Sequence, residues 1–496
     1  MDAEICPELL VPPTSGLSLA EHLPSPADLL PPELWELIFR HLSAAELLPV
    51  RLTSHRWKDI VTHSPTLLEK FTVTLEGIFF DDLSRVIPAA KLYIRSCRID
   101  RLVSWHETAH RLSCLTLDSC ELTLPTLVEM LAQTPNLKRL RLDEVDVLSS
   151  GCEIVANFRL DRLEKLVVEW VCCDGILDIF EGRCHRLKTF KIFGNQKEGN
   201  IVRFMKTVQD SLEYIKLCPT GALLEEISNL EHLKLKRIQI GKGSFDQSQL
   251  VEFCRRNHAI ENVCVHHLSL STQTLEQIGL QLSTLKRLRV TIAEKGTIVP
   301  TFLRSMKCLE YLCLLGEYCI EQSLDFTGCE CPMLVQLQTY ELPPVQRGLR
   351  QFFEKSSNIW YLTLDGSVFD SWPDVFTALE PLECLYELVL RHIKIRDDGD
   401  LKGEKCLVHR KNSSLNGLVL SHCKIPKDLL IRQICRCAEL EELWLTAIDS
   451  IDEAVVLALL GNLSKLKMLT ISECGEESVT SKVLNEGMAR GISINK

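Results

Sequence analysis

The apolar positions of this chain recur with a short spacing that is clearest at residues 112–122, LSCLTLDSCEL. This segment reads L-x-x-L-x-L-x-x-C-x-L, and the alternation at its centre predicts a short strand followed by a tight bend. The side chains expected in a core are Leu112, Leu115, Leu117 and Leu122, with Cys120 buried in the bend. The side chains expected to face outwards are Ser113, Cys114, Thr116 and Asp118. One such unit cannot bury its own apolar side, so it implies neighbours on both sides.

The same spacing returns along most of the chain. A looser first copy occupies residues 89–99, with Leu92, Ile94, Cys97 and Ile99 at the apolar positions. Later copies begin at Leu112, Leu137, Leu163, Leu187, Leu212, Leu230, Ile260, Leu285, Leu309, Leu334, Ile359, Leu385, Leu415, Leu440 and Leu466. The fifteen steps from residue 89 to residue 466 cover 377 residues, about 25 residues each. The step from Leu212 to Leu230 is short, and those after Leu230 and Leu385 are long.

This period, with a cysteine at the bend, resembles the cysteine-containing leucine-rich repeats. The resemblance implies an α/β solenoid, a horseshoe of about sixteen repeats over residues 89–496, with strands on the concave face and helices outside. Helices are expected between strands at residues 124–132, 248–255 and 429–435. The polar run 397–405 lacks the spacing of a calcium-binding EF-hand, and we interpret it as a solvated loop that leaves the stack.

The pattern differs before the array. Residues 1–27 hold five prolines and acidic side chains but no lysine or arginine, which predicts a disordered leader. From Leu30 onwards the apolar residues take helical spacing, with Pro32 in the first turn. Ser43 and Glu46 fit a capping box that opens a second short helix, and Thr53 or Ser54 can cap a third.

Three short helices are too few for a robust core of their own. Their apolar side chains are either completed by a partner or used to cap the solenoid, and the spacing alone is compatible with both.

The stretch LPPELWELIFRHLSAAELLPVRLTSHRWKDIV resembles the F-box, the motif that binds the Skp-type adaptor of cullin-based ubiquitin ligases. Departures from the family pattern are Pro49, Ser54 and Leu67-Leu68. The resemblance implies an all-helical F-box of three helices at 28–70, followed by a connector at 71–88. It further implies adaptor contacts, and through the adaptor a link to cullin, by Leu30, Pro31, Leu34, Ile38, Leu42, Leu47, Leu48 and Trp57.

Composition and charge narrow the classes of protein and of site that remain possible. A net charge of −11 argues against a general nucleic-acid binder. The N-terminus has no basic region followed by an apolar one, and no apolar run approaches the roughly 18 residues of a membrane span. We therefore expect residence in the cytoplasm or nucleus rather than secretion or membrane insertion. The 22 cysteines lack zinc-site spacing, and those at bends (Cys97, Cys120, Cys423, Cys474) are expected to be free core thiols. No metal or cofactor is expected.

Residues between the core leucines of each strand should line the concave face. The basic residues at these positions are Lys91, Arg95, Arg139, Arg141, Lys165, Lys191, Lys216, Lys234, Lys236, Arg287 and Arg289, against the acids Asp118, Asp143 and Glu169. Later copies give Arg391 against Asp365, Glu387 and Glu442. Aromatic residues at these positions include Tyr214 and Tyr311. We hypothesise that this face binds an acidic or phosphorylated protein segment. Alternatively, the cations only make an exposed sheet soluble.

No catalytic motif is present: the sequence has no Walker phosphate loop, no H-E-x-x-H and no G-x-S-x-G. The resemblance implies a non-catalytic, substrate-recognition subunit of an SCF-type ubiquitin ligase that recruits a protein substrate. Two alternatives stay open, a repeat scaffold that binds partners without driving their degradation and a receptor for a small anion.

Overall fold

The computed structural model describes residues 30–77, 89–103, 105–148, 157–194, 196–292, 296–316, 322–340, 345–396, 414–475 and 478–495. The expected leader at 1–27 and the expected polar loop at 397–405 lie outside these residues.

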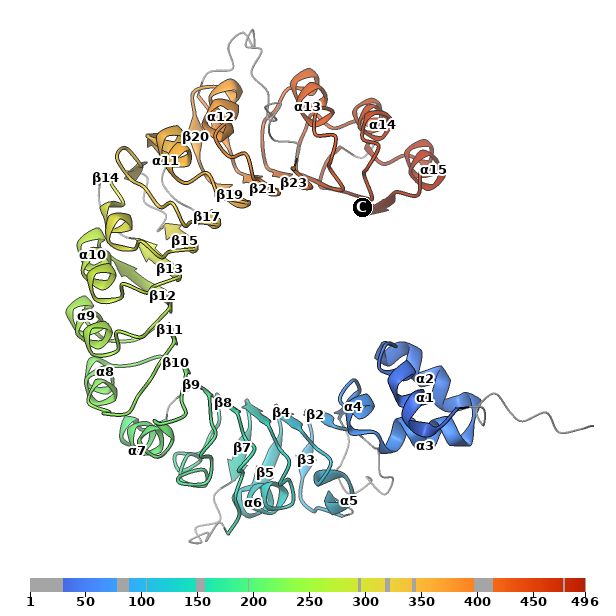
Figure 1. Cartoon of the computed structure of the whole chain (residues 1–496), viewed down its shortest axis with the longest axis vertical. Coiled ribbons are helices and arrows are strands. Elements are labelled where there is room, and N and C mark those ends of the chain that lie inside the picture. The colour runs from blue at the N-terminus through green and yellow to red at the C-terminus, as the bar shows by residue number, and fades with distance from the viewer. Residues whose placement is uncertain are drawn as a thin grey trace, which may run out of the picture.

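One continuous sheet lines the inside of a horseshoe (Figure 1). Its eighteen strands are all parallel, and each strand between β1 and β26 pairs with the strands of the preceding and following repeats. In chain order they are β1 (Thr72–Glu76), β2 (Lys91–Arg95), β4 (Cys114–Asp118), β6 (Arg139–Asp143), β8 (Lys165–Glu169), β9 (Thr189–Phe193), β10 (Tyr214–Leu217), β11 (Arg237–Ile240), β12 (Asn262–Leu270), β13 (Arg287–Ile292), β15 (Tyr311–Gly316), β17 (Gln336–Tyr340), β19 (Tyr361–Asp365), β21 (Glu387–Arg391), β23 (Gly417–Ser421), β24 (Glu442–Thr446), β25 (Met468–Ser472) and β26 (Ser493–Asn495).

Helices cover the outer side of this sheet. They are α5 (Trp105–Ala109), α6 (Leu124–Ala132), α7 (Glu198–Val208), α8 (Gly221–Ser228), α9 (Gln247–Arg256), α10 (Thr272–Gln281), the 3-10 helix η3 (Thr301–Ser305), α11 (Leu349–Lys355), α12 (Trp372–Leu379), α13 (Lys427–Ile434), α14 (Glu453–Asn462) and α15 (Ser481–Ala489). The three helices expected from the sequence correspond to α6, α9 and α13. Short second sheets follow some of the main strands: β3 (Arg98–Ile99), β5 (Glu121–Thr123) and β7 (Asp146–Leu148); β14 (Gly296–Ile298), β16 (Gln322–Asp325) and β18 (Val345–Arg347); β20 (Val368–Phe369) and β22 (Lys394–Ile395).

The alternation at 112–122 gives the predicted strand, β4. Leu115 and Leu117 are fully buried, while Thr116 between them stays on the concave face. Both leucines align with equivalent leucines of β6 in the next repeat. Because every repeat adds such a layer, the buried side chains merge into one core that runs along the array.

The bends after many strands share a left-handed backbone. Ser119 (φ 50°) and Ala447 (φ 51°) are examples, and their backbone N–H groups donate to the last strand residue of the next repeat. The residue that follows turns inwards: Cys120 is buried, and its thiol donates to the Ile94 carbonyl of the previous repeat at 3.4 Å. Cys423 does the same, and burial raises the pKa of its thiol to about 11. Free core thiols at the bends are thereby confirmed, and Cys474 is only half-buried.

Two predicted boundaries are wrong. β11 begins at Arg237 with Ile238 and Ile240 buried, so that repeat starts at Leu235 rather than Leu230. The flanking steps then become 23 residues (212 to 235) and 25 residues (235 to 260), and the irregularity disappears. The expected connector at 71–88 opens with a strand, because β1 pairs along its whole length with β2.

Four helices, α1 (Pro32–Phe39), α2 (Ala44–Thr53), α3 (His55–His63) and α4 (Pro65–Leu68), form the N-terminal end of the horseshoe. The predicted capping box at Ser43 and Glu46 is present, and Ser54 caps α3. These helices have their own small core around Phe39, Leu47 and Val61.

The left-handed bends give a stability test. A non-glycine residue in this region costs about 1–2 kcal/mol, part of which the greater chain entropy of glycine cancels. Ala447→Gly should therefore raise the free energy of unfolding by roughly 0.5 kcal/mol, measured by thermal or urea unfolding.

Its matched control is Ala458→Gly inside α14, which should lower stability by about 0.8–1 kcal/mol. Equal destabilisation by both changes would contradict the strain at Ala447.

Candidate functional surfaces

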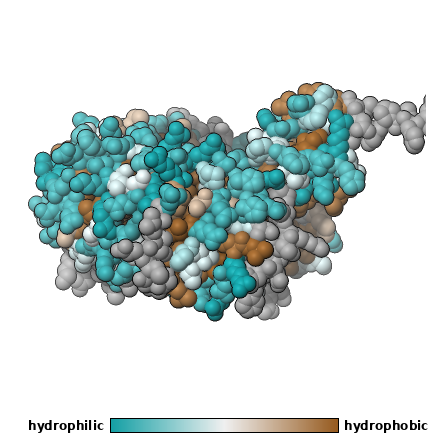
Figure 2. Space-filling model, turned by 90° about the horizontal axis from the view of Figure 1, so that it is seen from below, coloured by the Kyte–Doolittle hydropathy of each residue, from teal (hydrophilic) through white to brown (hydrophobic). Residues whose placement is uncertain are grey.

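Large apolar side chains of α1 and α2 face solvent. Leu34 (45% exposed), Leu37 and Ile38 lie on α1, and Leu48 and Leu52 (89% exposed) lie on α2. Figure 2 shows patches of hydrophobic residues among hydrophilic ones on the raised part at the right end of the molecule. We call these five residues the apolar face. Its size on so small a module is typical of a surface that a partner covers.

The eight predicted adaptor contacts divide into two groups. Leu34, Ile38 and Leu48 belong to the apolar face, and Pro31 beside them is exposed. The other four are half or fully buried: Leu30, Leu42, Leu47 and Trp57. Leu37 and Leu52 were missed, although Leu37 belongs to the same helical stripe and Leu52 follows Leu48 by four residues.

The inner residues hold the apolar face in place. Trp57 packs against Trp35 and Phe39 with ring centroids 4.7 Å and 5.7 Å apart. Arg56 donates to the Leu30 carbonyl at 2.9 Å and so fixes the start of α1 against α3. Since Leu47 is fully buried beneath this layer, its role is structural.

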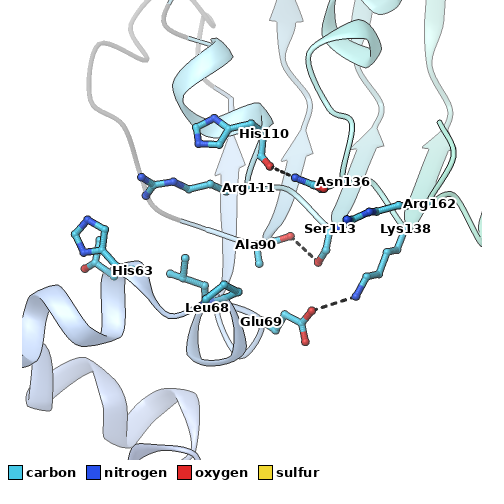
Figure 3. Close-up of a pocket in the computed structure, with 12 residues that line it drawn as sticks. His63, Leu68, Glu69, Ala90, His110, Arg111, Ser113, Asn136, Lys138 and Arg162 are labelled. Atoms are coloured by element: carbon cyan, nitrogen blue, oxygen red, sulfur yellow. Dashed lines mark hydrogen bonds and ion pairs between the residues drawn. The ribbon is translucent and has the colours of Figure 1, made fainter. Parts of the chain in front are cut away.

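The helical module is packed directly on the first repeats. Ala90 belongs to the same small core as Leu68, and Glu69 pairs with Lys138 at 3.4 Å (Figure 3). A cavity of about 360 Å³ remains between them, with Arg111 and Arg162 among its lining residues. The module is thus continuous with the solenoid in this structure.

On the concave face near the N-terminal end, two arginines are neutralised by neighbouring carboxylates. Arg141 of β6 pairs with Asp143 at 2.5 Å and with Glu169 of β8 at 2.7 Å. Arg95 of β2 lies 3.6 Å from Asp118, which also accepts a hydrogen bond from Tyr93. Arg95 and Arg141 are therefore already paired within the face, whereas Lys91, Arg139 and Lys165 form no ion pair with any described residue.

Further along, five cations have no such partners. They are Lys191, Lys216, Arg237, Arg287 and Arg289, on β9, β10, β11 and β13, and we call them the cationic belt. No carboxylate among the described residues forms an ion pair with any of them. Strand pairing places Lys191 beside Lys216, and Arg237 and Arg287 on either side of Asn262.

Aromatic rings lie between the belt cations. The Lys216 ammonium is 4.4 Å from the centroid of Phe193, and Arg237 and Lys191 are 4.5 Å and 5.3 Å from that of Tyr214. Arg287 lies 4.6 Å from the Tyr311 centroid. Burial lowers the pKa of Lys191, and the neighbouring Lys165 and Lys216 ammonium groups lower it further. The Glu169 carboxylate has a smaller opposite effect, so the positive charge around Lys191 is crowded and only partly compensated.

The prediction that Lys234 and Lys236 lie on the concave face is wrong. Both precede β11, and Lys236 pairs with Glu213 at the edge where the strands begin, at 3.2 Å. The error follows from the misplaced repeat start, and Arg237 takes their place on the face. The structure places the other six predicted substrate residues, Lys191, Lys216, Arg287, Arg289, Tyr214 and Tyr311, on neighbouring strands of that face.

The C-terminal part of the face has the opposite character. Glu387 and Glu442 flank Gly417 in the strand register, and Trp444 projects nearby. Burial raises the pKa of Glu387, and the Glu442 carboxylate raises it further. Towards the C-terminus the belt thus gives way to strands on which Asp365, Glu387 and Glu442 outnumber the single cation Arg391.

Among the described residues, no group of three or more His, Cys, Asp and Glu side chains is placed to hold a metal ion. No described helix has both the length and the apolar character that a membrane span requires.

Comparison with known proteins agrees with this division of the chain. The F-box-like family model matches residues 27–72. Comparison with curated protein sequences gave no significant match. Solved structures with a similar fold include mouse RP105 in complex with MD-1, at 14% identity over 87% of this chain and 81% of that one, with a TM-score of 0.51. A leucine-rich-repeat protein of Leptospira interrogans matches at 15% identity over 88% of this chain and 97% of that one, with a TM-score of 0.45.

At such identities the likeness concerns the fold alone. The chain therefore has an F-box-like domain followed by an α/β solenoid of the leucine-rich-repeat type. Both kinds of module typically serve interactions rather than catalysis.

The pKa of Lys191 reports how strongly the neighbouring cations of the belt repel it. Lys216→Gln removes a neighbouring cation, so protonated Lys191 is less destabilised and its pKa should rise. NMR titration of ¹³C-dimethylated lysines would report this shift.

The control is Lys286→Gln. The Lys286 ammonium pairs with Glu261 at the edge where the strands begin, away from the cationic belt. An unchanged Lys191 pKa in the Lys216 variant would contradict the proposed crowding.

Proposed function

We propose that this chain is the substrate-recognition subunit of an SCF-type, cullin-based ubiquitin ligase. In this proposal the apolar face binds a Skp-type adaptor, and through it cullin, while the concave face recruits a protein substrate. The observation that carries the proposal is the exposed apolar face on a module that an F-box-like model matches.

The energetics of the module support a docking role. Burying a leucine or isoleucine side chain completely contributes about 1.5–3 kcal/mol, so covering the apolar face would yield substantial binding energy. The buried Leu47 and the Trp35–Phe39–Trp57 cluster keep that face in shape without a partner. A preformed surface loses little conformational entropy on binding.

The chain would supply proximity rather than chemistry. Ubiquitin transfer belongs to other subunits of such a ligase, and holding a substrate beside them raises its effective concentration. The direct packing of α4 on the first repeats supports this role, because it ties the adaptor surface to the substrate surface.

Adaptor binding is tested with Leu34→Asp/Ile38→Asp. Placing two carboxylates on the apolar face should weaken capture of the Skp-type adaptor by at least about tenfold, measured by co-purification and titration. The loss should extend to cullin.

The matched control is Leu280→Asp on α10, since this leucine is equally apolar and 61% exposed but lies on the outer side of the repeats. Adaptor capture that survives the double substitution would refute the docking surface.

The same variant distinguishes a role in substrate degradation from a role as a non-degradative scaffold. Under proteasome inhibition, full-length wild type and Leu34→Asp/Ile38→Asp should retain the same substrate, and only the wild type should promote its ubiquitination. A bound partner whose ubiquitination is equal in both cases would favour a scaffold.

A further inference from the structure

We infer that the cationic belt binds an extended, carboxylate-rich segment of a partner protein. This inference rests on the proposed function, because it names the chemistry of the substrate that the concave face would recruit. The belt consists of Lys191, Lys216, Arg237, Arg287 and Arg289.

The first argument is the contrast between paired and unpaired cations. At the edge where the strands begin, Lys236 pairs with Glu213 and Lys286 pairs with Glu261 at 3.1–3.2 Å. Arg141 is likewise paired on the face itself. Lys91, Arg139 and Lys165 on the same face also form no ion pair with any described residue, so what distinguishes the belt is the packing of its cations around shared aromatic rings. Crowded in this way, Lys191 is repelled by Lys216 and Arg237, and an incoming carboxylate relieves that repulsion.

The second argument is that the cations are held in place. The Tyr214 hydroxyl donates to Gln239 and the Tyr311 hydroxyl donates to Gln338, both at 2.8 Å. These fixed rings in turn hold the cations stacked over them. A partner then meets an already ordered surface, so less side-chain entropy is lost on binding.

The same aromatic rings argue against single-stranded nucleic acid as the partner of the belt. Binding of bases requires free aromatic faces on which to stack. Tyr214 has both Lys191 and Arg237 within 5.3 Å of its centroid, and Lys216 lies over Phe193. The rings support cations instead of offering themselves to bases, which favours a protein segment.

The third argument is that the Arg289 guanidinium has no counter-charge beside it. The Nε of Arg289 is buried and has no hydrogen-bond partner among the described residues. Its strand neighbours on the face are Cys264 and Cys313, which offer no charge to balance it. Burial raises the pKa of the Cys313 thiol to about 11, so this neighbour stays neutral. The buried Nε itself is out of reach of an incoming group, but a partner carboxylate that pairs with the outer side of this half-exposed guanidinium would supply the missing counter-charge.

Spacing decides between many carboxylates and one phosphate. The belt extends over four strand-to-strand steps from β9 to β13, or roughly 19 Å at about 4.8 Å each. An extended chain advances about 3.3 Å per residue, so about six residues cover the belt. Cations spread over this length suit a run of acidic side chains better than one compact phosphate group.

The test is fluorescence anisotropy with the full-length chain and a labelled peptide of six glutamates flanked by glycine and serine. Lys191→Glu/Arg289→Glu should weaken binding by at least about tenfold. The matched control is Lys236→Glu/Lys286→Glu, which changes the net charge equally in neighbouring repeats but only at the paired edge; it should change affinity by less than about threefold. Melting temperatures identify any unfolded variant, and Lys191→Gln/Arg289→Gln serves as a milder second pair.

Equal weakening by the belt and control pairs would overturn the inference, as it would reflect net charge alone. Tighter binding of a labelled single-stranded oligonucleotide, or of a peptide with a single phosphoserine, would also overturn it. Because the peptide assay needs no adaptor, its failure is distinguishable from a failure of adaptor capture measured on the same variants.

Discussion

A parallel strand that is apolar on one side has no stable existence alone, and this constraint shapes the whole molecule. Each strand needs a neighbour for its backbone and a layer for its leucines. The result is a core that grows along the array, from Leu75 of β1 to Ile471 of β25. Only the positions between the core residues are left free to vary, so recognition chemistry is confined to them.

The interior of the repeats follows directly from spacing. The segment 112–122 and helix α6 lie where the pattern predicts them. Burial of one side requires apolar residues at every second position in a strand but at every third or fourth position in a helix. The start at Leu230 was wrong because Leu230-x-x-Leu233-x-Leu235 and Leu235-x-x-Ile238-x-Ile240 both satisfy the motif. Backbone pairing of β11 with β10 and β12 decides between them, and pairing is not encoded in one segment.

The sequence predicts less well which residues are exposed and which charges are paired, because both depend on neighbouring segments. Leu47 and Leu48 are identical neighbours, yet one is fully buried and the other is exposed. Whether a concave cation is paired depends on residues more than one repeat away, as with Arg141 and Glu169, which are 28 positions apart. Composition of the face was therefore predictable, but the distinction between paired arginines and the unpaired cationic belt was not.

The direct join between α4 and the first repeats has a mechanical consequence. Since Ala90 lies in the core of the helical module and β1 pairs with β2, the described residues of this module and of the first repeats are packed as one unit. The number of repeats between β1 and β9 sets the distance from the helical module to the belt. Each added or deleted repeat would shift the belt along the arc by about 4.8 Å. Repeat number would thereby select which part of a captured protein faces the rest of an assembly.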